Sequence, residues 1–162
     1  TYCTMKGRSM DDLVAPLDAA FTQHAKVAGA TTTGVGDGGN ELGMGKVASA
    51  VEEHIPLGST IACVGAADYL VAAGVSNWGA WGIIAAAQVM GRSQAEGATK
   101  DATAHPALPS VEEESALADA LVAAGCCDGI RGIPSRSVDG LDFDVHAEKL
   151  TTLRELASPA EA

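Results

Sequence analysis

The stretch from residue 34 to residue 45, GVGDGGNELGMG, constrains this chain more than any other part of it. Six of its twelve residues are glycine, and its only charged side chains are Asp37 and Glu41. Glycine loses the most conformational freedom on folding, so such a stretch is expected where the backbone adopts positive φ or where a ligand approaches the main chain. A β-branched run, 30–33, precedes it and a helix-like run, 46–55, follows it. We therefore predict a strand-to-helix turn at which backbone N–H groups converge.

A nucleotide-binding role for this turn is disfavoured. Residues 34–39 match Gly-x-Gly-x-x-Gly, but the dinucleotide fingerprint also needs an acidic residue about 20 positions later, at the end of the next strand. That place falls at 54–58, before the next predicted strand begins. Asp37 and Glu41 would also repel a pyrophosphate, and no Gly-Lys-Ser/Thr follows to complete a Walker A loop. A glycine-rich turn that binds no ligand is the other alternative.

Residues 36–45, GDGGNELGMG, resemble the signature of the D-glutamate cyclase family. The similarity continues through GVSNWG at 74–79, VDGL at 138–141, HAE at 146–148 and the N-terminal residues 2–7, which end in MKG. This resemblance covers most of the chain and corresponds to the C-terminal part of the larger cyclase domain. It implies that residues 1–162 are the C-terminal portion of a D-glutamate cyclase-like domain whose N-terminal portion is absent from this chain.

Composition narrows the range of partners. Apolar residues make up 47% of the 162 residues, which is enough for a core, and aromatic residues only 4%, so that core must consist mainly of aliphatic side chains. The net charge of −11 argues against nucleic acids and against anionic membrane surfaces as partners. No apolar run has the length of a membrane span. We expect no nucleic-acid partner and no membrane span.

The cysteine pattern indicates reduced thiols. Cys3, Cys63, Cys126 and Cys127 include no Cys-x-x-Cys pair. We predict buried, unpaired thiols in a reducing compartment. The family resemblance implies the mitochondrial matrix, with the cytoplasm as the alternative.

Alternating helix and strand signals predict an α/β fold: a layered, partly parallel sheet with helices on both faces, followed by a C-terminal β-hairpin and helix. The predicted strands cover about 29–35, 60–64, 69–73 and 126–133; the predicted helices cover about 15–26, 46–55, 78–90, 110–124 and 145–156. Ser110 and Glu113 form a capping-box pattern, and Asp144 is the predicted cap of the last helix. Asp139-Gly140 marks the turn of a hairpin over 137–143.

Polar residues follow three of the predicted strands. Asp37 comes after the first strand, Asp68 after the second, and Ser76 and Asn77 after the third. Ligands of α/β sheets bind beyond the carboxyl ends of the strands. We therefore expect Asp37, Asn40, Glu41 and Asp68 to lie around one cleft.

The resemblance implies a hydro-lyase that closes D-glutamate to 5-oxo-D-proline with loss of water. This reaction needs a base for the ammonium group, neutralisation of the γ-carboxylate and an acid for the departing oxygen. Asp37 and Glu41 are candidates to hold the ammonium group and take its proton, and His146 is a further candidate acid or base. The expected substrate-binding residues are Gly38, Gly39, Asn40, Ser76 and Asn77, with the N–H groups of the two glycines as oxyanion donors.

Several alternatives stay open at this point. Asp37, Glu41 and Asp68 could instead bind a divalent cation such as Mg²⁺, Mn²⁺ or Ca²⁺, and no other cofactor is expected. The chain could be a non-catalytic cyclase-like subunit of a larger, mitochondrial assembly, or a metal-dependent hydrolase. A partial domain would leave apolar faces bare. We therefore expect the missing N-terminal segment or another chain to pack against this one and to close the cleft over Asp37.

Overall fold

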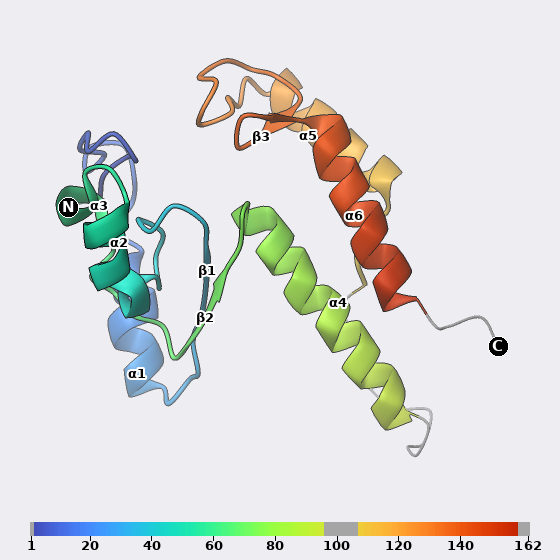
Figure 1. The fold of residues 1–162 in the computed structure, drawn as a ribbon, viewed down its shortest axis with the longest axis horizontal. Helices are drawn as coiled ribbons and strands as arrows, with labels where there is room; N and C mark the ends of the chain where they lie inside the picture. The colour runs from blue at the N-terminus through green and yellow to red at the C-terminus, as the bar shows by residue number, and fades with distance from the viewer. Residues whose placement is uncertain (1, 96–106, 159–162) are drawn as a thin grey trace. The chain divides into compact units, whose positions relative to one another are not determined.

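The computed structural model describes residues 2–95 and 107–158 (Figure 1). The chain forms two compact units, residues 1–79 and residues 80–162. Helix α4 (Ser76–Ala95) contains the boundary between them. The fold is mixed α/β, with a small parallel sheet in the first unit and an antiparallel hairpin followed by a helix at the C-terminal end, as predicted.

The first unit is built around two parallel strands, β1 (Thr33–Gly36) and β2 (Tyr69–Ala72), which lie side by side (Figure 1). Their register pairs Thr33 with Tyr69 and Gly36 with Ala72, so the carboxyl ends of both strands meet at the same edge. The helical segments of this unit are η1 (Ala20–His24), α1 (Ala25–Val27), η2 (Gly45–Val47), α2 (Ala48–His54) and α3 (Gly58–Ile61). The predicted turn between β1 and a following helix is thus confirmed, with a 3₁₀ segment, η2, ahead of α2.

The strand predicted over 60–64 is wrong, because this region begins as the helical turn α3 and continues without regular structure. A short apolar run fits a buried strand and a buried helical turn equally well. Leu57 adopts a left-handed φ of 61°, and Gly58 lies directly against the backbone of Val51. Beyond α3, the N–H of Cys63 donates to the carbonyl of Gly39 rather than to a neighbouring strand.

The first helix begins later than predicted. Residues 11–14 form turns, and helical geometry begins at residue 18, with the π-helical segment η1 ahead of α1. Pro16 lacks an N–H and disfavours helical geometry in the residue before it, which accounts for the late start.

The second unit contains α5 (Val111–Ala123), strands β3 (Ser137–Val138) and β4 (Leu141–Asp142), and α6 (Phe143–Ala157), which packs against α5. The predicted capping box is confirmed, because Ser110 and Glu113 exchange side-chain-to-backbone hydrogen bonds at the start of α5. The predicted turn is confirmed as well, with positive φ at Asp139 and Gly140. Helix α6 has Asp142 rather than Asp144 as its N-cap residue.

The strand predicted over 126–133 is also wrong, because this segment forms turns around the buried side chain of Asp128. Its carboxylate accepts hydrogen bonds from the N–H groups of Ile130 (2.8 Å), Arg131 (2.9 Å) and Gly140 (3.0 Å). An aspartate that bonds to nearby backbone in this way competes with strand pairing.

Each unit has its own buried residues. The first unit buries Met44, Val51, Ile61, Ala67 and Val75; the second buries Trp81, Ala85, Leu108, Phe143, Leu150 and Ala157. All four cysteines are unpaired, but Cys3 and Cys63 are partly exposed and Cys126 and Cys127 fully so, so their predicted burial is wrong. Within the described residues, no helix combines the length and the apolar character needed to cross a membrane.

Candidate active site

The glycine turn folds around the carboxylate of Glu41. One carboxylate oxygen accepts hydrogen bonds from the N–H groups of Asp37 (3.2 Å) and Gly38 (2.8 Å), and the other accepts one from Gly39 (2.8 Å). Successive N–H groups aimed at one anion form a nest. The N–H groups of Gly38 and Gly39, predicted to bind a substrate oxyanion, are therefore bound by the chain's own carboxylate.

The glycines of this turn are required mainly by contacts within the protein. Gly39 has a φ of 99°, and a Cβ at this position would lie 2.5 Å from the Cγ2 atom of Val51. A Cβ at Gly38 would lie 2.7 Å from the sulfur of Met5. Close approach to the backbone was one reason to expect glycine here, and the groups that come close are the protein's own side chains.

Asp37 lies at the carboxyl edge of the sheet, directly after β1. Its Oδ2 atom accepts a hydrogen bond from the N–H of Ser76 (2.6 Å). Ser76 follows β2 by a few residues and begins the 20-residue helix α4, and the exposed Asn77 lies in the same first turn. The predicted convergence of Asp37 with Ser76 at two strand ends is therefore observed.

The two carboxyl groups of the turn have pKa values displaced in opposite directions. Partial burial of the carboxyl group, followed by its hydrogen bond with Glu41, raises the pKa of Asp37 above its ordinary value, against the opposing effect of the Ser76 N–H. Burial alone would raise the pKa of Glu41 as well, but hydrogen bonds from Gly38 and Asp37 outweigh it and hold that pKa below its ordinary value. Within this pair Asp37 is therefore the carboxyl group that more readily holds a proton, and Glu41 is the one that more readily stays ionised.

Asp68 does not join this pair. It precedes β2 rather than following a strand, and its carboxylate accepts hydrogen bonds from the N–H (2.8 Å) and the hydroxyl (2.9 Å) of Thr32. These hydrogen bonds, first the one from the backbone, lower the pKa of Asp68. Asp68 lies level with Thr32, which precedes β1, so Asp68 and Asp37 lie at opposite ends of two parallel strands, about 16 Å apart at about 3.3 Å per residue. The prediction of one cleft shared by Asp37 and Asp68 is wrong.

A divalent cation does not fit the residues that the structure brings together. Asp37, Glu41 and Asp68 do not converge, and the described part of the chain contains no group of three or more His, Cys, Asp or Glu side chains able to hold a metal ion. The oxygens of Glu41 are already bound by three N–H groups.

Asn40 and His146 each contact residues other than Asp37. The Nδ2 atom of Asn40 donates to the carbonyl of Cys3 (3.1 Å) and thereby holds the N-terminal segment beside the turn. His146 belongs to the second unit, is 3% exposed, and has its ring centroid 4.3 Å from that of Trp81. Burial lowers the pKa of His146, so the imidazole is neutral at neutral pH.

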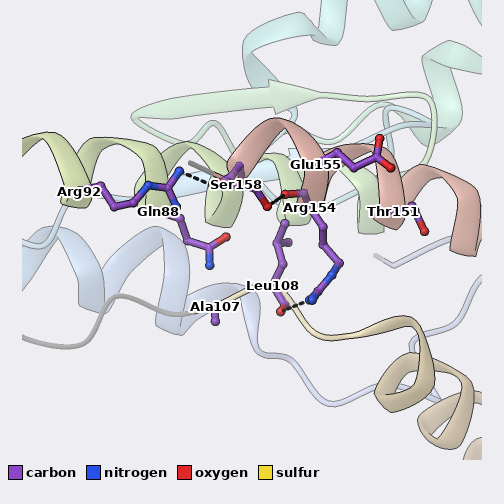
Figure 2. A pocket seen from close by; sticks show the side chains of 9 residues that line it. Gln88, Arg92, Ala107, Leu108, Thr151, Arg154, Glu155 and Ser158 are labelled. Carbon is purple, nitrogen blue, oxygen red and sulfur yellow. Dashed lines mark hydrogen bonds between the residues drawn. The ribbon is translucent and has the colours of Figure 1, made fainter. Parts of the chain in front are cut away.

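A cavity of about 480 Å³ lies in the second unit, close to the ends of α4 and α6 (Figure 2). Its lining residues are Gln88, Arg92, Ala107, Leu108, Thr151, Arg154, Glu155, Ala157 and Ser158. Arg154 donates to the carbonyls of Leu108 (3.0 Å) and Pro109 (2.7 Å), and Arg92 donates to that of Ala157. These arginines therefore hold backbone segments together, and none of the predicted site residues lines this cavity.

Comparison with known proteins places these residues in a family. A family model described as "D-glutamate cyclase-like, C-terminal" matches residues 1–154. The protein named "D-glutamate cyclase, mitochondrial" from Homo sapiens is 39% identical over 172 aligned residues, which cover 97% of this chain and 27% of the human protein. The chain thus spans about a quarter of the length of this curated relative.

Proposed function

The chain belongs to the D-glutamate cyclase-like, C-terminal family, and on this premise we propose that it carries out proton transfer in the closure of D-glutamate to 5-oxo-D-proline and water. The observation that carries the proposal is the Asp37–Glu41 pair, whose pKa values are displaced in opposite directions. Because the chain covers 27% of the human relative, the activity named for that protein is a proposal for this one.

The proton balance of the reaction defines what a catalytic group must do. The substrate begins with an ammonium group and a γ-carboxylate, and it ends with one N–H in the lactam ring and a molecule of water. Two protons therefore move from the nitrogen to one carboxylate oxygen, and no net proton enters or leaves. A single carboxyl group that accepts from nitrogen and donates to oxygen can carry both protons in turn.

Asp37 suits this role. Its Oδ2 atom is bound by the Ser76 N–H, and the residue as a whole is exposed, so a substrate can approach the carboxyl group and exchange protons with it. A raised pKa makes the protonated form more abundant near neutral pH, where it can neutralise the γ-carboxylate. We assign the proton-carrying role to Asp37.

Glu41 supports Asp37 rather than reacting. Both of its oxygens are bound by the N–H groups of the turn, so they are poorly placed to accept a proton from substrate. Its negative charge favours the protonated form of Asp37, because like charges at short range disfavour a second ionisation.

The start of α4 is the proposed binding place for a substrate carboxylate. The N-terminal end of a helix attracts anions through the helix dipole, and this attraction remains at α4 although the N–H of Ser76 is already bound by Asp37. Ser76 and Asn77 occupy this first turn next to Asp37. His146 is given no step in this proposal, because it is buried against Trp81 and Phe143 in the second unit.

The direct test is formation of 5-oxoproline by the purified 162-residue chain, measured by chiral chromatography and mass spectrometry with D- and L-glutamate. Asp37→Asn keeps the shape of the side chain and should lower the rate by at least about 100-fold, the scale of general acid–base catalysis. Asp12→Asn is the matched control, because Asp12 is an exposed aspartate of the same unit. An Asp37→Asn variant as active as Asp12→Asn would exclude the assignment.

A second candidate is a non-catalytic cyclase-like part of a larger, mitochondrial assembly. The observation that favours it is the coverage of 27% of the human relative, which leaves most of that protein without a counterpart in these residues. A folded chain that forms no 5-oxoproline from either enantiomer, with or without chelator, would support this candidate over the cyclase. The word "mitochondrial" in the relative's name supports a mitochondrial location, with the cytoplasm as the alternative, and cell fractionation tests it.

A further inference from the structure

A second cavity, of about 900 Å³, lies in the first unit and is bordered by residues of the glycine turn. Its wall includes Asn40 and Leu42, the two sequence neighbours of Glu41, but neither Glu41 nor Asp37. The side chains of Asp37 and Glu41 therefore do not line this cavity, which is a separate site from the one proposed for cyclisation.

One helical face supplies the polar side of the cavity. Asp18, Thr22 and Lys26 all line it, and their spacing of four residues places them on one face of the helical segment. The Asp18 carboxylate accepts a hydrogen bond from the Tyr2 hydroxyl, and the Thr22 hydroxyl donates to the Asp18 carbonyl (2.7 Å). Both groups are thus bonded within the protein.

Lys26 is the basic side chain of this cavity, and its charge is not neutralised by a close partner. Among residues 2–95 and 107–158, no carboxylate forms an ion pair with it. It acts on the Asp68 carboxylate only as a longer-range charge. An ammonium group of this kind favours an anionic ligand group close to it.

The remaining wall is largely apolar. Met10, Val14, Leu42 and Ile61 line it together with Val64, whose side chain is 99% exposed. Apolar walls with a few fixed polar groups are typical of small-molecule sites, and the volume lies in the usual range for them.

We propose that this cavity binds an amphipathic monocarboxylate, with its apolar chain against Met10, Leu42 and Ile61 and its carboxylate at Lys26. The ligand class follows from one basic side chain, Lys26, in a largely apolar wall whose carboxylate, Asp18, is already bonded to Tyr2. The assignment stands on the cavity alone and does not depend on the cyclase activity.

A ligand in this cavity would contact the segment that supports the glycine turn. Three backbone hydrogen bonds join that segment to the turn: Cys63 N–H to Gly39 O (2.9 Å), Gly45 N–H to Gly65 O (3.0 Å) and Ala67 N–H to Gly43 O (3.1 Å). Binding to the folded chain should therefore raise its thermal midpoint, because a ligand that binds only the native state stabilises it.

Octanoate is the probe for calorimetric titration of the full 162-residue chain. We expect saturable one-to-one binding that Lys26→Met weakens by about tenfold, the effect of losing a charged hydrogen bond. Lys149→Met, which removes an exposed lysine of the second unit, is the control and should leave binding unchanged. No saturable binding, equal binding to Lys26→Met, or equal binding of octylamine would each overturn the proposal.

The cysteines locate the bound probe. Cys3 and Cys63 line the cavity, whereas Cys126 and Cys127 are exposed in the second unit. Octanoate should slow alkylation of Cys3 and Cys63 by N-ethylmaleimide, measured by peptide mass spectrometry, and leave the rates at Cys126 and Cys127 unchanged. Binding that slows none of the cavity thiols, or all four equally, would place the ligand elsewhere and overturn the assignment.

Discussion

Replacement of Glu41 by Gln tests whether the glycine turn is held together by its own carboxylate. The glutamine amide offers one oxygen, and in place of Oε1 this oxygen can still accept from Asp37 and Gly38. The NH₂ group then takes the place of the oxygen that accepted the 2.8 Å hydrogen bond from the N–H of buried Gly39, so two hydrogen-bond donors face each other. Loss of one charged hydrogen bond, with a buried N–H left unpaired, should cost about 1.5–3 kcal/mol.

The assay is equilibrium urea unfolding followed by circular dichroism, which gives the free energy of unfolding. The control is Glu52→Gln, because Glu52 is an exposed glutamate on α2 in the same unit. Glu41→Gln should lower the free energy of unfolding by the stated amount relative to this control. A difference below about 0.5 kcal/mol, the usual scatter of surface substitutions, would refute the reasoning.

The stability difference between wild type and Glu41→Gln should also depend on pH, and the sign of this dependence can be predicted. The pKa of Glu41 in the folded chain lies below its ordinary value of 4.5, so the carboxylate stabilises the fold above that pH. This stabilisation is lost as the pH falls through the lower, folded-state pKa. The stability difference between wild type and Glu41→Gln should therefore be full near neutral pH and shrink in acid, and a difference that grows in acid would contradict the assigned direction.

Two further substitutions test the local structure. Asp128→Asn should lower the free energy of unfolding by about 2 kcal/mol, because charged hydrogen bonds are lost. The control is Asp139→Asn, which changes an exposed turn residue and should leave the free energy of unfolding nearly unchanged. Hydrogen bonds to backbone N–H groups outweigh the effect of burial and hold the pKa of Asp128 at about 2, so its contribution should persist below its ordinary value of 3.8 and disappear only as the pH falls toward 2. Gly39→Ala should destabilise the fold by about 2–3 kcal/mol, because Gly39 has a positive φ and an added Cβ would contact Val51. The control Gly82→Ala, in helix α4 with open space around it, should stabilise the fold by about 0.5–1 kcal/mol. Thermal denaturation measures both variants, and equal effects would contradict the packing argument.

Local signals in the sequence predicted local structure well. The capping box at Ser110 and Glu113 and the turn at Asp139-Gly140 each depend on a few adjacent residues, and both are confirmed. The strands predicted at 60–64 and 126–133 failed because distant partners decide these segments. Cys63 donates to the backbone of Gly39, and the Asp128 carboxylate binds the N–H of Gly140.

The predictions for the candidate site were likewise right in some respects and wrong in others. Convergence of Asp37 and Ser76 at two strand ends was predictable from the order of strands and helices, and it is observed. Asp68 was misplaced because the prediction put a strand before it, whereas it precedes β2. The sequence predicted a nest of N–H groups but not which anion fills it, because that depends on where the Glu41 side chain turns.

Because Glu41 occupies the nest of N–H groups, a different group has to neutralise the substrate in the proposed reaction. The γ-carboxylate of the substrate has to lose its negative charge before nitrogen attacks, and the N–H groups of Gly38 and Gly39 are already bound. Within this turn, the proton of Asp37 can neutralise the γ-carboxylate instead. The neighbouring negative charge of Glu41 favours this protonated form of Asp37. On this proposal the glycine turn acts on the substrate indirectly: its N–H groups fix Glu41 in the ionised form, and Glu41 in turn keeps Asp37 able to donate.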